Sequence, residues 1–520
     1  MAAVLLGQCG GLTAAAVEQV EPAGAPEVTV QEETPDTPEV TVQEETPDTP
    51  EVTVQEETPD TPEVTSLEAS SGTFTDSSFS WTLDADGLLT ISGSGPMPGE
   101  KPWGSSAYIT KIVLEEGITQ LPNDAFNGCA TVTEVTLPST LTAIGNSAFT
   151  NCDALASINL PVGLQTIGDS AFRWCNALRE ITLPGTVTNF TNAFLQSGLE
   201  RVTIQEGVTA ISSDAFANCG QLEEVKLPST ITSIGEEAFL KCSSLTSISL
   251  PDTVTSIGAG AFNESGLTSF TIPEGLTSLS NSVLANTKIT SISIPSHIKT
   301  IGDSAFRGCT QMETLTIAEG VTSIGANAFE RCEMITEIVV PDSVTSLGGY
   351  AFKGCENVVT ARLPDHLTVL PESLFAECYI LEDVNMPAAL EVIEAGALDY
   401  CKKIQTIILP SGVTTIKDRA FRACESLREV VIPASVTSIA GGTVNSAFYW
   451  CSSFTLYVEP GSYAETYAKE NNCTYEYIVD GNRLSLTVTG PDGAPVAEGY
   501  AIDWYDADTG DGRRRQHSGG

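Results

Sequence analysis

The sequence contains few basic side chains and few histidines. Its 520 residues include 24 lysines and arginines against 67 aspartates and glutamates, a formal net charge of -43. Because nucleic-acid-binding proteins neutralise phosphates with a basic surface, this balance argues against a nucleic-acid partner. The 3 histidines, His297, His366 and His517, are scattered, and none lies in a repeated context. We therefore expect neither a histidine general base nor a histidine metal site.

Long apolar runs are also scarce. Outside residues 1–16, no stretch is long and apolar enough to span a bilayer, so no transmembrane segment is predicted. Residues 1–16 are small and apolar, and the alanines at 14–16 fit the small-x-small pattern of a signal-peptide cleavage site. Because a positively charged start is missing, we interpret this segment as a truncated signal peptide. A disordered apolar tail is the alternative.

Motifs that carry catalysis are missing as well. The chain has no Gly-x-Ser-x-Gly elbow, no phosphate-binding loop and no His-Glu-x-x-His motif. Its many aspartates and glutamates lie at variable positions and form no recognisable pair for acid–base chemistry. We therefore predict that the protein is not an enzyme and that it holds no cofactor and no metal.

The sequence does contain a recurring phrase: alanine, phenylalanine, two variable residues and cysteine. The phenylalanine position returns at residues 126, 149, 172, 194, 216, 239, 262, 284, 306, 329, 352, 375, 398, 421 and 448. Successive copies are 22 or 23 residues apart, except for a final interval of 27. So steady a period predicts a solenoid, because each unit can bury its apolar side only against the next unit.

One copy shows how a single coil is expected to fold. Ile158 and Leu160 alternate with polar residues, which is typical of a half-buried strand. Pro161 ends this strand because proline cannot donate to a ladder. Ile167 marks a second short strand, and a helical turn then places Phe172 in the core. We predict about 15 such coils, with a parallel sheet on the concave face.

This repeat is similar to that of a known family. The pattern Leu-x-x-Ile-x-Leu-Pro-x-x-Leu-x-x-Ile-Gly-x-x-Ala-Phe-x-x-Cys resembles the BspA-like, Treponema-type leucine-rich repeat. The resemblance covers roughly residues 109–458, with Leu284 and Leu398 in place of phenylalanine. It implies a β-rich leucine-rich repeat solenoid. It also implies a bacterial surface protein that adheres to proteins of a host or a neighbouring cell.

Two different segments precede the solenoid. Residues 17–66 consist of proline- and threonine-rich acidic repeats, and residues 1–66 hold 15 acidic side chains and no basic one. Such a composition predicts a disordered, extended linker. Residues 67–108 alternate around the turn at residues 84–87, which predicts a β-hairpin that caps the first coil.

Two further segments follow the solenoid. Residues 459–480 contain an expected helix from Tyr463 to Asn471, N-capped by Ser462, and we interpret them as the C-terminal cap. Residues 481–520 read as the start of a truncated immunoglobulin-like β domain, followed by a tail.

Twelve of the 14 cysteines occupy the same repeat position, and only Cys9 and Cys473 stand outside it. A cysteine tied to one turn behaves as a small buried side chain with a weak donor. We therefore interpret the repeat cysteines as free buried thiols, with disulfides as the alternative. Their spacing of about 23 residues does not match the close Cys-x-x-Cys pairs of zinc sites.

Variation between copies is concentrated at two outward positions of the predicted strand. The middle copies carry serine and threonine there, whereas the C-terminal third mixes aliphatic and charged residues, which is typical of a protein contact. The alternative is that β-branched residues simply favour strands. We predict a partner-binding surface made of Glu337, Val339, Thr360, Arg362, Asp383, Asn385, Thr406, Ile408, Glu429 and Val431.

Together these features favour a secreted or cell-surface bacterial protein that mediates binding or adhesion. Its expected partner is an extracellular protein or glycan, and we expect the chain to be a monomer. Two alternatives remain open at this point. The solenoid could be a non-catalytic scaffold or spacer of a larger protein or enzyme whose other domain is missing, or a purely structural surface component.

Overall fold

The computed structural model describes residues 69–104, 106–442, 444, 446–478, 502–505 and 512–515. The chain divides into two compact units, and Thr65–Arg483 form the unit that holds the repeats. The predicted signal peptide and linker lie outside the described residues. The immunoglobulin-like prediction also falls mostly outside them, apart from an antiparallel pair made by β34 (Ile502–Tyr505) and β35 (Gly512–Arg515).

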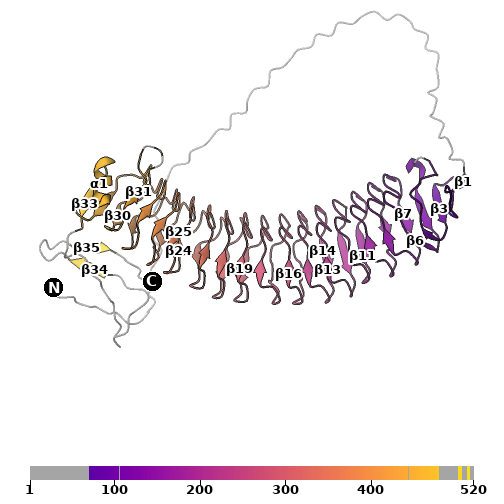
Figure 1. The fold of residues 1–520 in the computed structure, drawn as a ribbon, viewed down its shortest axis with the longest axis horizontal. Helices are drawn as coiled ribbons and strands as arrows, with labels where there is room; N and C mark the ends of the chain where they lie inside the picture. The colour runs from indigo at the N-terminus through magenta and orange to yellow at the C-terminus, as the bar shows by residue number, and fades with distance from the viewer. Residues whose placement is uncertain are drawn as a thin grey trace, which may run out of the picture. The chain divides into compact units, whose positions relative to one another are not determined.

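The repeats form a parallel β-solenoid of about 17 turns with little helix, which confirms the predicted fold class. Figure 1 shows its successive coils as a curved band. Each regular coil contributes one strand to a longer-strand ladder and one to a shorter-strand ladder. Apolar side chains from both ladders and from the connecting turns fill one continuous core.

The longer-strand ladder runs through β3 (Leu88–Ser92), β5 (Lys111–Leu114), β7 (Glu134–Thr136), β9 (Ser157–Ile158), β11 (Glu180–Leu183), β12 (Arg201–Ile204), β14 (Glu224–Lys226), β18 (Ser291–Ile294), β20 (Thr314–Ile317), β22 (Glu337–Val339), β24 (Thr360–Arg362), β26 (Asp383–Val384), β28 (Thr406–Ile408), β30 (Glu429–Ile432), β32 (Thr455–Val458) and β33 (Thr474–Tyr477). Its paired strands are parallel and in register, as in Ile181 beside Val202 and Val202 beside Val225. Equivalent side chains of successive coils therefore stack in rows.

The shorter-strand ladder runs through β4 (Gly95–Pro96), β6 (Ile118–Gln120), β8 (Ala143–Ile144), β10 (Thr166–Ile167), β13 (Ala210–Ile211), β15 (Ser233–Ile234), β16 (Ser256–Ile257), β17 (Ser278–Leu279), β19 (Thr300–Ile301), β21 (Ser323–Ile324), β23 (Ser346–Leu347), β25 (Val369–Leu370), β27 (Val392–Ile393), β29 (Thr415–Ile416) and β31 (Ser438–Ile439). Both ladders are interrupted in places. The longest interruption spans two coils between β14 and β18, where residues 247–250 and 269–272 form no strand.

At the N-terminal end, the predicted hairpin is present and is also the first turn of the solenoid. β1 (Ser70–Thr73) and β2 (Ser80–Leu83) pair antiparallel, β2 pairs antiparallel with β3, and β3 then pairs in parallel with β5. A 3-10 turn, η1 (Ser106–Tyr108), follows. Trp103 stacks on Phe126 with ring centroids 5.8 Å apart, so it takes the phenylalanine position. Its distance of 23 residues from Phe126 was the signal for this extra turn.

At the C-terminal end, the predicted helix is α1 (Tyr463–Glu470). The Glu465 N–H donates to Ser462 Oγ at 3.2 Å, which confirms the predicted N-cap. β33 then pairs in parallel with β32 and adds one more strand to the ladder. The capping segments themselves thus continue the ladder, and together with the predicted 15 or so coils they make about 17 turns.

Stacked phenylalanine rings form the centre of the core. Neighbouring centroids lie 5.2 Å apart for Phe306 and Phe329 and 5.5 Å apart for Phe329 and Phe352, with nearly parallel planes. Leu284 and Leu398 interrupt the stack and are fully buried. Apart from these positions, each ring contacts the next across the coil boundary, as a solenoid core requires.

The turn that carries each phenylalanine differs in detail from the predicted helical turn. In the first copy, the Asn127 N–H donates to the Asp124 carbonyl and the Cys129 N–H donates to the Phe126 carbonyl. Asp124 and Gly128 have φ of 56° and 80°. A right-handed helix cannot contain left-handed residues at this spacing. The segment is therefore a pair of tight turns, each with one left-handed residue.

We expect Phe329→Ala to destabilise the solenoid by about 3–5 kcal/mol, because it removes a buried ring that contacts both neighbouring coils. The measurement is the free energy of unfolding by urea. Phe329→Leu is the matched control, since leucine occupies the same position at 284 and 398, and it should cost less than about 1.5 kcal/mol. A loss of less than about 1 kcal/mol in Phe329→Ala would show that the buried ring contributes little.

Candidate binding surfaces

The outward side of the longer-strand ladder, which we call the long-strand face, contains the predicted binding residues. The C-terminal strands β22, β24, β26, β28 and β30 carry all of them except Asn385, which directly follows β26. Glu337, Val339, Thr406 and Ile408 are exposed, and the other six are half-buried. The structure thus places the ten residues on one face of consecutive coils.

Three of these residues make contacts that stabilise the fold. Arg362 Nη2 lies 2.6 Å from Asp383 Oδ2, which joins two neighbouring strands. Asn385 Oδ1 accepts from the Leu363 N–H at 2.7 Å, and Asn385 Nδ2 donates to the Leu363 carbonyl at 2.8 Å. The amide thereby continues the ladder where β26 ends. We assign Asn385 to the fold rather than to a partner.

The aliphatic members form the most distinctive part of the long-strand face. Val339 is 51% exposed and Ile408 is 43% exposed. Ile408 stands beside Val431, and Val431 stands beside Tyr457. The sequence analysis missed Tyr457 because it considered only the strand that precedes each repeat phenylalanine, and Tyr457 follows the last of these, Phe448.

A second feature of the same face was not predicted. A groove of about 520 Å³ lies over β9, β11, β12 and β14, where β9 and β11 do not pair. Its charged side chains pair with each other: Arg201 Nε lies 3.6 Å from Glu180 Oε2, and Lys226 Nζ lies 3.2 Å from Glu224 Oε1. The break between the strands has no signal in the repeat pattern.

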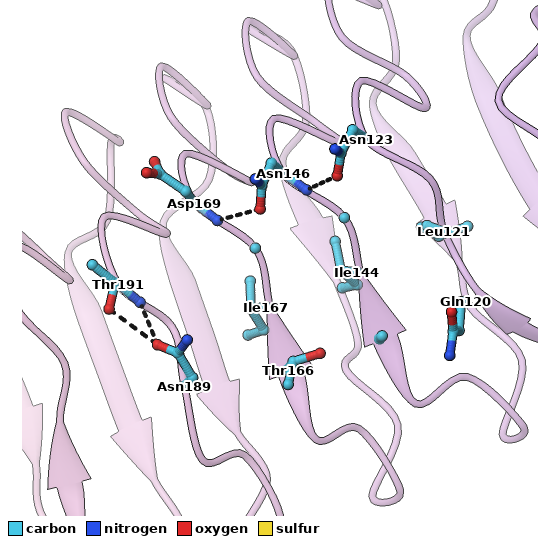
Figure 2. Close-up of a pocket in the computed structure, with 13 residues that line it drawn as sticks. Gln120, Leu121, Asn123, Ile144, Asn146, Thr166, Ile167, Asp169, Asn189 and Thr191 are labelled. Atoms are coloured by element: carbon cyan, nitrogen blue, oxygen red, sulfur yellow. Dashed lines mark hydrogen bonds between the residues drawn. The ribbon is translucent and has the colours of Figure 1, made fainter.

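A groove of about 450 Å³ lies on the shorter-strand ladder, and Figure 2 shows its lining. Asn123 Oδ1 accepts from the Asn146 N–H at 2.8 Å, and Asn146 Oδ1 accepts from the Asp169 N–H at 3.0 Å. Asn189 Oδ1 accepts from the N–H and the hydroxyl of Thr191. Because these bonds join one coil to the next or close a local turn, we assign the groove to the stability of the stack.

The turns that contain Ala-Phe-x-x-Cys form a ridge along the solenoid, which we call the turn ridge. The residues before the alanine and before the cysteine have left-handed φ in most coils, and serine, asparagine, aspartate and glycine are common there. Tyr350, Tyr400, Trp174 and Trp450 occupy such positions with φ between 58° and 62°. A left-handed backbone costs a non-glycine residue roughly 1–2 kcal/mol, which makes bulky aromatic residues unusual there.

The repeat cysteines form a ladder of free thiols, and all of the cysteines that the structure describes are free. Each thiol from Cys152 onward at this repeat position donates to the carbonyl of the phenylalanine or leucine one coil earlier, as in Cys355 Sγ to Phe329 O at 3.4 Å. Burial raises the pKa of Cys129 and Cys219 to about 11. Since the thiolate is the nucleophile, these cysteines are suited to packing and not to catalysis.

The two histidines in the described part of the chain contact no catalytic partner. His366 is exposed, and its Nε2 lies 3.0 Å from the Val344 carbonyl oxygen. His297 Nε2 is buried without a hydrogen-bond partner. The described residues contain no cluster of three or more potential metal ligands. Within the same residues, no helix is both long and apolar enough to cross a membrane.

Comparison with known proteins identifies the repeats. The sequence model of the BspA type leucine rich repeat region matches residues 103–223, 209–336 and 322–455, and these matches together span more than half of the chain. The chain belongs to the BspA-type leucine-rich repeat family. The first match begins at Trp103, the residue that starts the aromatic stack. No curated protein matches the chain.

Solved structures of several bacterial leucine-rich repeat proteins match the chain. A leucine-rich repeat protein from Bacteroides ovatus is 22% identical, with a TM-score of 0.48, over 79% of this chain and 99% of that one. One from Eubacterium ventriosum is 26% identical, with a TM-score of 0.39, over 74% and 95%. A leucine rich cell surface protein from Faecalibacterium prausnitzii is 25% identical, with a TM-score of 0.34, over 78% and 98%.

We expect the stability of this BspA-type solenoid to fall as the pH rises above about 9. Thiols of the unfolded chain ionise near pH 9, whereas Cys355, with a pKa raised by burial to about 12, stays protonated in the fold. Each such thiol therefore lowers the free energy of unfolding by about 1.4 kcal/mol per pH unit between these values. The measurement is urea unfolding at pH 8 to 11.

Cys355→Ser provides the control for this pH dependence. Serine keeps a donor for the Phe329 carbonyl and occupies the equivalent position at 197 and 265. Between pH 9 and 11 the free energy of unfolding of the variant should fall less steeply than that of the wild type, by about 1.4 kcal/mol per pH unit. An unchanged slope would mean that the Cys355 thiol ionises equally in the folded and unfolded chain.

Proposed function

We propose that this protein is a secreted or cell-surface bacterial binding protein, and that the C-terminal part of its long-strand face contacts an extracellular protein. Membership of the BspA-type family and the rigid, regularly spaced rows of outward side chains support a display surface.

One observation carries the choice of surface: apolar side chains stand exposed beside charged ones in the C-terminal coils. The row from Ile408 through Val431 to Tyr457 is continuous across paired strands, and Val339 lies further along the same face. In the middle coils, the equivalent positions carry residues such as Ser293 and Thr316. Exposed aliphatic and aromatic side chains next to charge are typical of protein interfaces.

The test is binding of the full chain to an array of purified extracellular proteins, followed by titration of every partner retained. We expect Ile408→Glu and Val339→Glu to weaken that binding at least tenfold, because each places a charge in the apolar contact. Ser293→Glu is the matched control, since it adds the same charge at the equivalent exposed position of a middle coil. Its affinity should stay within about twofold of the wild type.

Two outcomes would contradict this proposal. If no protein on the array is retained, the solenoid acts as a spacer and not as a protein receptor. If all three variants bind equally well, the contact lies on another surface.

A further inference from the structure

Aromatic side chains gather on the turn ridge of three of the four coils that end at Cys378, Cys401, Cys424 and Cys451. Tyr379 directly follows the cysteine of one coil, and Tyr400 directly precedes the cysteine of the next. Tyr449 and Trp450 lie two coils further along, in the turn that ends at Cys451. We call these four residues the aromatic patch.

Contacts across the coils hold the aromatic patch in place. The Arg422 guanidinium lies 4.8 Å from the centre of the Tyr400 ring, and Lys402 Nζ lies 5.7 Å from that of Tyr379. Trp450 stacks on Tyr449 with centroids 5.1 Å apart.

Backbone bonds fix the spacing between these coils. The Tyr400 N–H donates to the Arg422 carbonyl and the Ala423 N–H donates to the Tyr449 carbonyl, both at 2.8 Å. With about 4.8 Å between stacked coils, the patch extends for roughly 14 Å along the axis.

The charges around the aromatic patch are paired with each other. Arg422 Nε donates to Asp399 Oδ1 at 2.7 Å, and Lys402 Nζ lies 3.0 Å from Glu425 Oε1. The cations that cover one side of the rings thus carry their own counter-ions. A surface of this kind favours a neutral ligand with hydroxyl groups over a strongly charged one.

The backbone beneath the aromatic patch is left-handed, as it is at this position in the other coils. Tyr400 and Trp450 have φ of 61° and 62°, at a position where other coils carry Asn151, Asn218 and Asn286. Asparagine suits left-handed backbone far better than a bulky aromatic residue does. Trp450 is also 60% exposed, so its side chain is not explained by packing. An exposed aromatic side chain that does not serve packing is a candidate for contact with a ligand.

We propose that the aromatic patch binds a neutral oligosaccharide chain. The C–H faces of two alternate sugar rings of one chain stack on the rings of Tyr400 and Trp450, and the paired ions exchange hydrogen bonds with sugar hydroxyls. A ridge of aromatic rings in line fits an extended chain better than a compact ligand. This inference extends the proposed binding function to a second surface.

The experiment measures retardation of the full chain in native gels that contain xylan, mixed-linkage β-glucan, galactomannan or dextran. We expect at least one of these neutral polysaccharides to retard the wild type. The double variant Tyr400→Asn with Trp450→Asn should raise the dissociation constant at least tenfold. Because asparagine already occupies this position in other coils, the urea unfolding midpoint should be unchanged or higher.

Trp174→Asn is the matched control. Trp174 lies at the same repeat position with φ of 58°, and the Arg173 guanidinium covers its ring at 3.9 Å. Within two coils on either side its row carries Gly128, Asn151, Gln196 and Asn218, none of them aromatic, whereas Tyr400 and Trp450 lie two coils apart in that row. This variant should keep the affinity of the wild type.

Three results would overturn the proposal: no retardation by any of the four polysaccharides, equal affinity of the double variant, or an equal loss in Trp174→Asn. Protein binding by the long-strand face and polysaccharide binding by the aromatic patch can be disproved independently. Ile408→Glu should leave polysaccharide retardation unchanged, and the aromatic double variant should leave binding on the protein array unchanged. If the double variant instead lost protein binding alone, the patch would be a protein contact and not a glycan site.

Discussion

Contact between one coil and the next, made by a stacked ring and a thiol beside it, is the interaction on which the rest of this structure depends. Phe329 lies between Phe306 and Phe352, and the Cys355 thiol donates to the Phe329 carbonyl. A single coil can bury its apolar side only against the coils next to it. Because the same two residues recur in most coils, the spacing of the coils, and with it the register of both ladders, is set from within the core.

That spacing controls what the surface can do. Equivalent side chains on the long-strand face are separated by the distance between paired strands. Side chains of neighbouring coils therefore form rows such as Ile408, Val431 and Tyr457. The turn ridge follows the same spacing and brings Tyr379 and Tyr400 onto successive coils. Specificity for a binding partner therefore comes from residues at the variable positions of the repeat. The constant positions only set the spacing between coils.

Much of this organisation could be predicted from the sequence. The period of 22 or 23 residues predicted the solenoid and its parallel ladder, and the cysteine spacing indicated free thiols. The helix at Tyr463–Glu470 was predicted from an N-cap and a short helical run. The structure has two turns beyond the predicted 15 or so coils, and both were predicted as caps, because Trp103 replaces phenylalanine in the first and no Ala-Phe-x-x-Cys phrase follows Cys451. The turn at each phenylalanine was predicted as helical because spacing alone does not reveal left-handed φ.

The sequence by itself determined which repeat positions face the core. The steady period aligns equivalent positions of neighbouring coils, and the alternation of apolar and polar residues separates inward from outward side chains. Only the tertiary structure decided what the outward residues contact. It showed that Asn385 completes the ladder, that Arg362 pairs with Asp383, and that Ile408 is left exposed. These outcomes depend on which side chains face each other across a coil boundary. Residues some 20 positions apart in the chain become neighbours only when the coils stack.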